Sequence, residues 1–525
     1  MMDDKKDASH KRETELKRWN WTPEKVYHWG FTFAITAYAL WRFATNEQNA
    51  FLLEQMPRAF RSSPYGLKQK RDAVNWEWET TRYVVTTAWK WYLLHPVLGR
   101  ATAFVAPSLV PVFYAAYSLL YVTFAFGWEV ALLFVGQHAA FYAVAALHSP
   151  ALCYVLAAFI HVQKFFIPFD AFRYMYPRYG LMPYRAAFVI FHWNILRGLS
   201  FSVEFVRAER QKNAGDGRRR SPPYWKTLGY LMYLPMVYLG PPQRYDEYIA
   251  QLDKPKPSCT PRVIASAITG VLRSGAHFFL MELMGHFFYS SAMSRWSWMG
   301  ERLDLSSLAG YALSLEFHYY VCYLFSYGFA GALAKAEGIQ VPETAPCIAR
   351  LHRCSRFWRY FDRGMHLWIR RYIYEPVLGD TRTAFRMLLG TAVAFTFTCT
   401  WHNLYADNAV WCALSALGIG LEVVTMETRK WTPVKKFEVR YLASPERMRV
   451  AKALLGSPHF LLTMCACLFH LAELDVCLVI CRRILTGFPF PMVPILVTLY
   501  SACNVALDVA EWEASATAKQ KQASS

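Results

Sequence analysis

Charged side chains are scarce in this chain of 525 residues. They make up 18% of it, whereas hydrophobic residues make up 54%. Soluble domains have about 25% charged residues, so the composition argues against a chain of soluble domains and favours one polytopic membrane bundle. The 19 Trp and 32 Tyr point the same way, because their rings favour the boundary between water and lipid.

The chain also lacks a zinc motif and a cleavable signal peptide. No CxxC pair is matched by a second Cys or His pair, which argues against structural zinc. Most of the twelve cysteines fall in apolar runs, where Cys behaves as a small hydrophobe. Residues 1–25 are charged and have no apolar core, so we expect the first membrane segment to act as an uncleaved insertion signal.

The net charge of +19 is not gathered in a separate polar domain. Its basic residues lie between apolar segments, which disfavours nucleic acid as a partner. Contact with anionic head groups, orientation of cytosolic loops or attraction of an anionic substrate are better interpretations. Two strongly basic loops, 207–220 and 429–452, are predicted to face the cytosol by the positive-inside rule.

Apolar runs long enough for a bilayer follow one another along the chain. They predict an all-α polytopic membrane protein with about eleven or twelve transmembrane helices and additional re-entrant segments. We expect a charged N-terminus at 1–25, one membrane domain at 26–510 and a polar tail at 511–525. The runs are 26–43, 83–98, 101–126, 130–147, 150–169, 186–205, 224–239, 263–293, 308–333, 384–401, 409–424, 460–481 and 488–509.

His402 stands at the end of the apolar run 387–401. A titratable side chain at membrane depth is costly and usually serves a function. Imidazole is the natural general base near neutral pH, and burial would keep it uncharged. The simpler interpretation is a histidine packed at the membrane boundary.

Asp362 interrupts the aromatic-rich stretch 357–362. It could form an ion pair with Arg359 or Arg363. It could also pair with His366, four residues on and on the same helix face, or with His402, and the sequence does not rank these partners. The segment 357–377 is too charged for a lipid-facing crossing, so we expect it to be re-entrant.

Two further groups of charges have alternative interpretations. The arginines between 353 and 371 form either a solvated face or a fork for phosphates. Glu282 and Glu316, inside long apolar runs, are interpreted as paired structural carboxylates in preference to channel-lining groups. With His318 they would form the ion path of a transporter, but no matching halves with interrupted helices are visible.

Several motifs together resemble the membrane-bound O-acyltransferase (MBOAT) family. The stretches 358–366 and 369–377, followed by Trp401-His402, are similar to the branch that attaches palmitate to the N-terminal cysteine of Hedgehog signals. The resemblance spans about 67–424 and includes 70–73 with 76–78, 201–204, 233–241, and 282–284 with His286. Two departures from the pattern are Asn403, where Gly is usual nearby, and Glu375, which replaces a common apolar residue.

The resemblance implies a helical bundle around a central tunnel, with His402 and Asp362 as the catalytic pair. A muscle-type paralogue of the branch lacks the histidine, so its presence here argues for activity. Cys347 matches a cysteine that can ligate a haem iron through its thiolate. The residues assigned to substrate binding are Trp358, Arg359, Arg363, His366, Arg370, Trp401 and Asn403.

The activity implied by the resemblance is transfer of a palmitoyl group from acyl-CoA to the N-terminal cysteine amine of a secreted Hedgehog-type protein. The implied place is the endoplasmic reticulum membrane or the Golgi, with membrane lipids as further partners and no nucleic acid. No cofactor is needed for the chemistry, and haem b is the one cofactor implied. The alternatives are O-acylation of a hydroxyl on a secreted peptide or a lipid, and a catalytically silent regulator.

Overall fold

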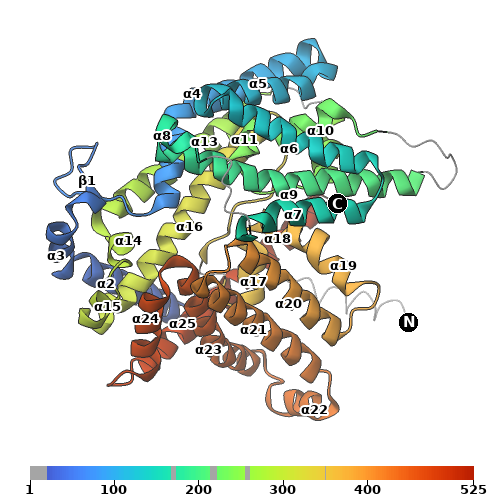
Figure 1. Ribbon diagram of the computed structural model, residues 1–525. Helices are drawn as coiled ribbons and strands as arrows, with labels where there is room; N and C mark the ends of the chain where they lie inside the picture. The colour runs from blue at the N-terminus through green and yellow to red at the C-terminus, as the bar shows by residue number, and fades with distance from the viewer. Residues whose placement is uncertain (1–20, 167–172, 213–220, 255–259, 349–350, 525) are drawn as a thin grey trace, which may run out of the picture.

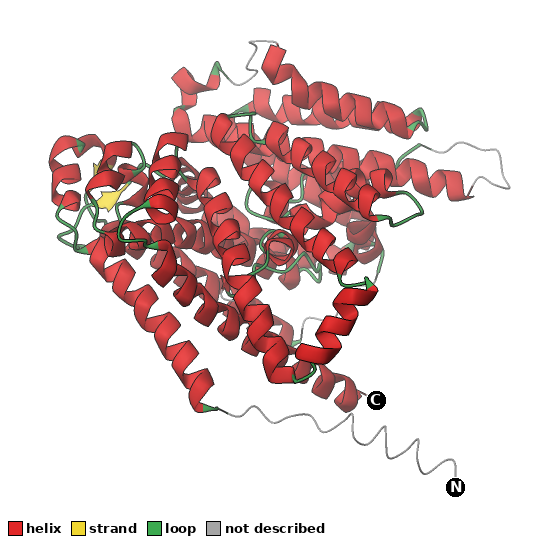
Figure 2. Cartoon of the chain, turned by 90° about the horizontal axis from the view of Figure 1, so that it is seen from below, coloured by secondary structure: helices red, strands yellow, loops and turns green. Residues whose placement is uncertain are grey.

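The computed structural model describes residues 21–166, 173–212, 221–254, 260–348 and 351–524. The chain is a bundle of helices that run in several directions around a central group of shorter helices (Figures 1 and 2). In the first half, the helices are α2 (Pro23–Ala44), α3 (Gln48–Gln55), α4 (Trp76–Val105), α5 (Val110–Phe126), α6 (Trp128–Ala146), α7 (Pro150–Phe166), α8 (Met175–Tyr179), α9 (Leu181–Lys212), α10 (Tyr224–Leu231), α11 (Leu234–Val237) and α12 (Tyr245–Leu252).

The second half continues the helical pattern. Its helices are α13 (Pro261–Phe287), α14 (Ser290–Met293), α15 (Ser297–Arg302), α16 (Leu305–Ala336), α17 (Cys354–Tyr360), α18 (Arg363–Ile369), α19 (Glu375–Leu378), α20 (Ala384–Trp401), α21 (Ala406–Thr428), α22 (Thr432–Tyr441), α23 (Pro445–Leu471), α24 (Leu474–Thr486) and α25 (Met492–Ser524). Short 3-10 turns lie at Pro57–Ala59 and Pro107–Leu109. The expected helical membrane architecture is thus confirmed.

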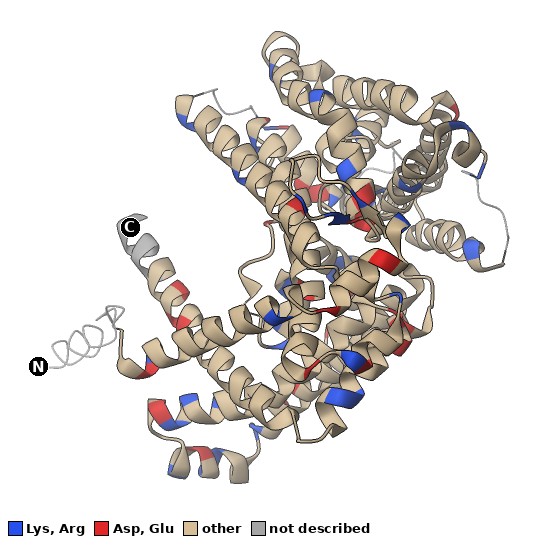
Figure 3. Ribbon diagram, turned by 90° about the vertical axis from the view of Figure 1, so that its left-hand side faces the viewer, with Lys and Arg blue, Asp and Glu red and all other residues tan. Residues whose placement is uncertain are grey.

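Seven described helices are long and apolar enough to cross a membrane, by length and composition. This count is lower than the eleven or twelve crossings that the sequence predicted. Helices α2, α4, α16 and α20 have the length, but polar or charged side chains interrupt their apolar character. Charged residues recur as coloured bands through the molecule (Figure 3). The seven are Pro107–Phe126, Trp128–Ala146, Leu181–Gln211, Pro261–Phe287, Ala406–Thr428, Pro445–Leu471 and Met492–Thr517.

Some continuous apolar runs are broken in the structure. The run 101–126 divides at Ala106 and Pro107, because proline lacks the N–H that would continue the helix. The run 460–481 divides at Ala472, whose backbone is extended. The run 224–239 becomes α10 and α11, whereas 384–401 forms a helix with the expected bounds.

A small sheet departs from the all-helical expectation. Strands β1 (Phe60–Arg61) and β2 (Arg71–Asp72) pair antiparallel, with Phe60 opposite Asp72. They close the polar stretch between α3 and α4 into a compact loop at the edge of the bundle (Figure 1). The sheet has only two residues in each strand, so packing against the neighbouring helices must stabilise it.

The segment expected to be re-entrant is a series of short helices. Helices α17 and α18 are followed by a π-helical turn, Arg370–Tyr374, and by α19. This orange part of the chain lies near the centre of the molecule, next to α20 and α21 (Figure 1). Widened π turns are frequent at functional sites. Whether the segment re-enters a membrane stays a prediction.

The relative directions of helices α20, α21 and α23 determine which of their ends lie near His402. A four-residue turn joins α20 to α21, so the two run antiparallel. Helix α21 has 23 residues and is about 35 Å long. The basic segment that contains α22 therefore lies at the opposite end of α21 from His402. Helix α23 returns and ends at Leu471, close to the His402 turn.

Candidate active site

A cavity of about 450 Å³ opens among α16, α17, α18, α20, α21 and α23. Its lining is largely aromatic and apolar, with polar groups concentrated at a few points. Of the predicted residues, those that line it are Trp358, Arg359, Asp362, His366, Arg370, Trp401 and His402. The histidine and the carboxylate, forty positions apart in the chain, therefore face the same space.

The other two predicted substrate-binding residues are not in this lining. Arg363 Nη1 pairs with Glu343 Oε2 at 3.2 Å, and neither residue lines the cavity. Asn403 forms the turn that follows His402. Its backbone φ is 68°, in the left-handed region where Asn is among the better tolerated residues.

The end of α20 is fixed by its backbone hydrogen bonds. Leu404 N donates to Cys399 O at 3.0 Å, and Asn403 N donates to Thr400 O at 3.2 Å. These two bonds are the pattern of a Schellman motif, which satisfies the last carbonyls of a helix. The departure from Gly at 403 is thus conformationally compatible, and His402 is held at a defined helix end.

Side-chain contacts from α7 support the same turn. Lys164 Nζ donates to Asn403 Oδ1 at 2.7 Å and to Trp401 O at 3.4 Å. The ring of His161 stacks on Trp401 with centroids 5.3 Å apart. A cation beside the carbonyl end of a helix is electrostatically favourable. Helix α7 therefore supports the turn that holds the catalytic candidate at two points.

The His402 ring lies in an aromatic corner. It meets Trp411 edge to face, with centroids 5.1 Å apart, and His470 at 4.8 Å. The Trp358 ring stacks on the Trp411 ring, with centroids 5.1 Å apart. Because these rings come from α17, α20, α21 and α23, the corner links four helices.

Asp362 begins α18 as its N-cap residue. Its Oδ1 accepts from Met365 N at 2.9 Å, and its Oδ2 accepts from Tyr327 Oη at 2.8 Å. Neither His366 nor His402 hydrogen-bonds to it in the described structure, so both expected histidine partners and the expected arginine partners are replaced by a tyrosine. Burial raises the pKa of the Asp362 carboxyl, while these donors lower it.

His366 lies one helical turn beyond Asp362. Burial lowers the pKa of its imidazole to about 4, and the nearby Arg359 and Arg370 act in the same direction. The ring is therefore neutral at physiological pH. A neutral imidazole can offer one donor and one acceptor to a ligand in the cavity.

The arginines are divided between the cavity and structural pairs. Arg371 binds Glu204 of α9 through two parallel hydrogen bonds of 2.9 and 3.1 Å. Arg370 Nε donates to Glu375 Oε1 at 3.0 Å, which gives the unexpected Glu375 a partner. Arg359, Arg370 and Arg382 line the cavity and supply its positive charge. Arg371 is thus held in a structural pair, which neither of the two interpretations of the arginine cluster described.

Several residues of the site were not identified from the sequence. His470 and Trp411 line the cavity but lie in ordinary apolar runs. Tyr319, Tyr323 and Tyr327 follow one another at intervals of four on α16, and the hydroxyls of the first two are 3.3 Å apart. That spacing places three phenols on one helix face. It is the feature of the sequence from which these tyrosines could have been identified.

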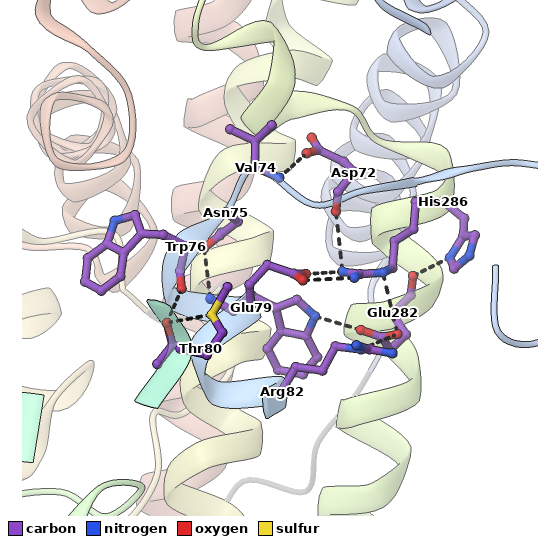
Figure 4. A network of polar contacts seen from close by, with 12 residues as sticks. Asp72, Val74, Asn75, Trp76, Glu79, Thr80, Arg82, Glu282 and His286 are labelled. Carbon is purple, nitrogen blue, oxygen red and sulfur yellow. Dashed lines mark hydrogen bonds and ion pairs between the residues drawn. The ribbon is translucent and has the colours of Figure 1, made fainter. Parts of the chain in front are cut away.

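A second polar network holds the N-terminal motif against α13 (Figure 4). Glu282 accepts from Trp78 Nε1 at 2.8 Å and from Arg82 Nε at 3.2 Å, and lies 3.8 Å from Arg71 Nε. Arg71 also pairs with Glu79. The prediction that Glu282 is a paired structural carboxylate is confirmed. Glu316 differs: its buried Oε1 has no hydrogen-bond partner among the described residues.

Cys347 is exposed on the loop after α16 and is free. Tyr320 Oη donates to Pro346 O at 3.1 Å, which fixes the adjacent backbone. Its thiol is therefore accessible to a ligand, which is the property that thiolate ligation of the implied haem iron would use. The described residues contain no cluster of three or more His, Cys, Asp or Glu arranged for a metal ion.

Comparisons with known proteins agree with these features. The model of the family described as MBOAT, membrane-bound O-acyltransferase family, matches residues 75–465. The chain is 28% identical over 391 residues to protein-cysteine N-palmitoyltransferase Rasp of Drosophila melanogaster, which covers 72% of this chain and 74% of the relative.

Two mouse proteins are similar as well. Protein-cysteine N-palmitoyltransferase HHAT is 29% identical over 315 residues, covering 59% of this chain and 62% of the relative. The HHAT-like protein is 26% identical over 468 residues, with 87% and 88% covered. Both the His402 and the Asp362 segments lie within the region that the family model matches.

Proposed function

This chain belongs to the membrane-bound O-acyltransferase family, and on that premise we propose that it transfers a palmitoyl group from acyl-CoA to the N-terminal cysteine amine of a secreted Hedgehog-type protein. Its relatives Rasp and HHAT bear the name protein-cysteine N-palmitoyltransferase. The observation that carries the proposal is the single cavity lined by His402, Asp362 and three arginines.

His402 and Asp362 have distinct roles in the proposed reaction. The acceptor amine attacks the thioester carbonyl, an amide bond forms, and CoA leaves as its thiol. His402 carries the proton transfer, either from the attacking nucleophile or to the departing thiolate. Asp362, fixed by Tyr327 and Met365 N–H, orients the acceptor. Because the thioester is activated, positioning and proton transfer are the main tasks of the protein.

The arginines and aromatic rings suit the two ends of an acyl-CoA. Arg359, Arg370 and Arg382 offer planar donors to the phosphates. The apolar lining, with Trp358 and Phe395 among it, accommodates the chain, whose burial contributes about 0.8 kcal/mol per CH₂. Trp401 and His366 complete the lining toward the reacting centre.

The direction of α21 supports an arrangement in which the two substrates approach from opposite sides. The basic segment 429–452 is placed in the cytosol, and Arg382 lies at that end of α20, whereas His402 lies at the other end. Acyl-CoA thus enters from the cytosol and the secreted acceptor from the lumen. A secreted acceptor implies the endoplasmic reticulum membrane, or the Golgi, as the location.

A bound haem is a separate part of the proposal. Cys347 would hold the iron through its thiolate, and the haem would supply a redox-active centre outside the acyl-transfer cavity. Purified protein should then show a Soret band that Cys347→Ala loses. A wild-type preparation without this band removes haem from the proposal.

The test of the proposed function compares acceptors. Purified protein in lipid nanodiscs is mixed with labelled palmitoyl-CoA and a Hedgehog N-terminal peptide, the same peptide with an acetylated amine, a peptide whose Cys is replaced by Ser, or a lipid alcohol. We expect label on the peptide with a free N-terminal Cys and none after acetylation. Label on the lipid or on a serine hydroxyl alone would replace the proposal with O-acylation.

A further inference from the structure

A second histidine shares the cavity with His402. His470, from the end of α23, lines the cavity, and its ring centroid is 4.8 Å from that of His402 at an interplanar angle of 81°. Trp411 stacks on His470 with centroids 4.0 Å apart and a 19° angle. The ring is therefore held against a flat partner and faces the other imidazole.

The hydrogen-bond partners of Asn408 determine the tautomer of the His470 imidazole. Asn408 Nδ2 donates to His402 O at 3.3 Å, and a carbonyl oxygen can only accept. The amide oxygen of Asn408 must then face His470, and it lies 3.0 Å from Nδ1. Since that oxygen can also only accept, Nδ1 of His470 carries the hydrogen. Its Nε2 is left with a free lone pair.

The contact with Asn408 leaves His470 ready to act as a general base. A base works best when a third group holds its ring in the correct tautomer, and Asn408 does so for His470. No side-chain hydrogen bond orients the ring of His402 among the described residues. Of the two imidazoles, His470 is thus the one whose basic nitrogen is defined by the surrounding protein.

The surroundings of His470 are nearly free of charge. Tyr319 of α16 meets the ring edge to face, with centroids 5.4 Å apart. Trp411 and Asn408 come from α21, and His402 follows α20. Among these described neighbours, the titratable groups are the phenol of Tyr319 and the imidazole of His402.

We propose that His470 is a second catalytic residue, the base that accepts the proton of the acceptor amine, and that His402 acts at the thioester and its sulfur. This inference rests on the proposed acyl transfer. As the N–C bond forms and the C–S bond breaks, the amine proton moves to Nε2 of His470. It then passes, through the adjacent His402, to the departing thiolate, so that amide and CoA thiol form without net proton change.

The experiment alters the group behind His470. Asn408→Asp places an anion on Nδ1, which favours the protonated ring. We expect the acidic limb of the kcat/KM profile to move toward higher pH by about one unit. Asn408→Ala removes the same hydrogen bonds without adding charge. Its activity should fall while the acidic limb moves by less than about half as much.

Direct replacement provides the second arm. His470→Gln keeps a donor that can reach Asn408 but removes the basic nitrogen, so kcat should fall by about 100-fold or more, with the KM for palmitoyl-CoA nearly unchanged. His277→Gln, on α13 and outside the lining described for the cavity, is the matched control. Thermal unfolding of every variant shows whether it is folded.

The outcomes separate the two proposals. A folded His470→Gln protein with wild-type kcat, or Asn408→Asp and Asn408→Ala with the same pH profile, overturns the assignment of His470 and leaves acyl transfer standing. If the wild type acylates a lipid or a hydroxyl instead, the same variants are assayed on that acceptor. A folded wild type that acylates no acceptor overturns both proposals.

Discussion

Tyr327 and Asp362 are joined by a 2.8 Å hydrogen bond from the phenol to the carboxylate. The two residues lie on α16 and at the start of α18, so the bond ties the long helix to the segment 354–378, which contributes the largest share of the cavity lining. The bond also holds Oδ2 of Asp362, so the carboxylate group does not rotate freely. The orientation of Asp362 is therefore set in part by a residue that lies outside the predicted motifs.

Removing that phenol should weaken catalysis without unfolding the protein. Tyr327→Phe keeps the ring and its 5.0 Å contact with Tyr323 but leaves the carboxylate with one donor fewer. A hydrogen bond to a charged group contributes about 1.5–3 kcal/mol, so we expect kcat to fall by about tenfold or more. Steady-state kinetics measure it, and an unchanged kcat would show that this bond does not orient Asp362.

The turn after His402 should depend on the backbone conformation of Asn403. Asn403→Gly allows the same left-handed φ and should retain most activity, although the bond from Lys164 is lost. Asn403→Val forces a β-branched residue into that region, at a cost of about 1–2 kcal/mol. Thermal unfolding and transfer rates compare the two. Equal behaviour of both variants would mean that the Schellman turn does not position His402.

The Glu282 network should dominate the stability of the N-terminal motif. Glu282→Ala leaves Arg71, which is 3% exposed, with one buried partner fewer, and breaking such a pair costs about 3–5 kcal/mol. Proteolysis of the loop between α3 and α4, followed over time, measures the loss. Glu301→Ala, which removes an exposed pair with Arg482, is the control and should change little.

His366 gives the protein a defined pH response. Its folded pKa of about 4 lies below the ordinary value of 6.5, so between these values the unfolded chain binds more protons. Stability therefore rises with pH through this window and falls on acidification. His366→Gln should lose less stability than wild type between pH 7 and pH 5, measured by thermal unfolding. A steeper loss in the variant would contradict the buried, neutral assignment.

The sequence predicted the bundle because long apolar runs leave few alternatives in lipid. It also placed His402 and Asp362 in one passage, since the resemblance joined motifs forty residues apart. The breaks at Pro107 and Ala472 were not predicted. Apolar composition continues across both. Pro107 was a visible helix breaker, whereas the turn at Ala472 shows only in the packing of the following helix.

The polar partners within the site were harder to predict. Asp362 was expected to bind a histidine or an arginine, yet its partner is Tyr327, because α16 brings its phenols alongside the start of α18. His470 was missed for a similar reason. Its neighbours in sequence are apolar, and Asn408, which defines its role, lies on another helix. Contacts between distant helices are not encoded in local spacing.

The most direct test of the central claim is the rate of label transfer from palmitoyl-CoA to a Hedgehog N-terminal peptide by His402→Ala and Asp362→Asn. Asn keeps the N-cap of α18, so the second variant should fold normally, and Arg363→Gln, outside the cavity lining, is the control. We predict that the first two lose transfer by at least about 100-fold while the control stays near wild type. Near-wild-type transfer by folded His402→Ala or Asp362→Asn protein would contradict a single catalytic cavity built on that pair.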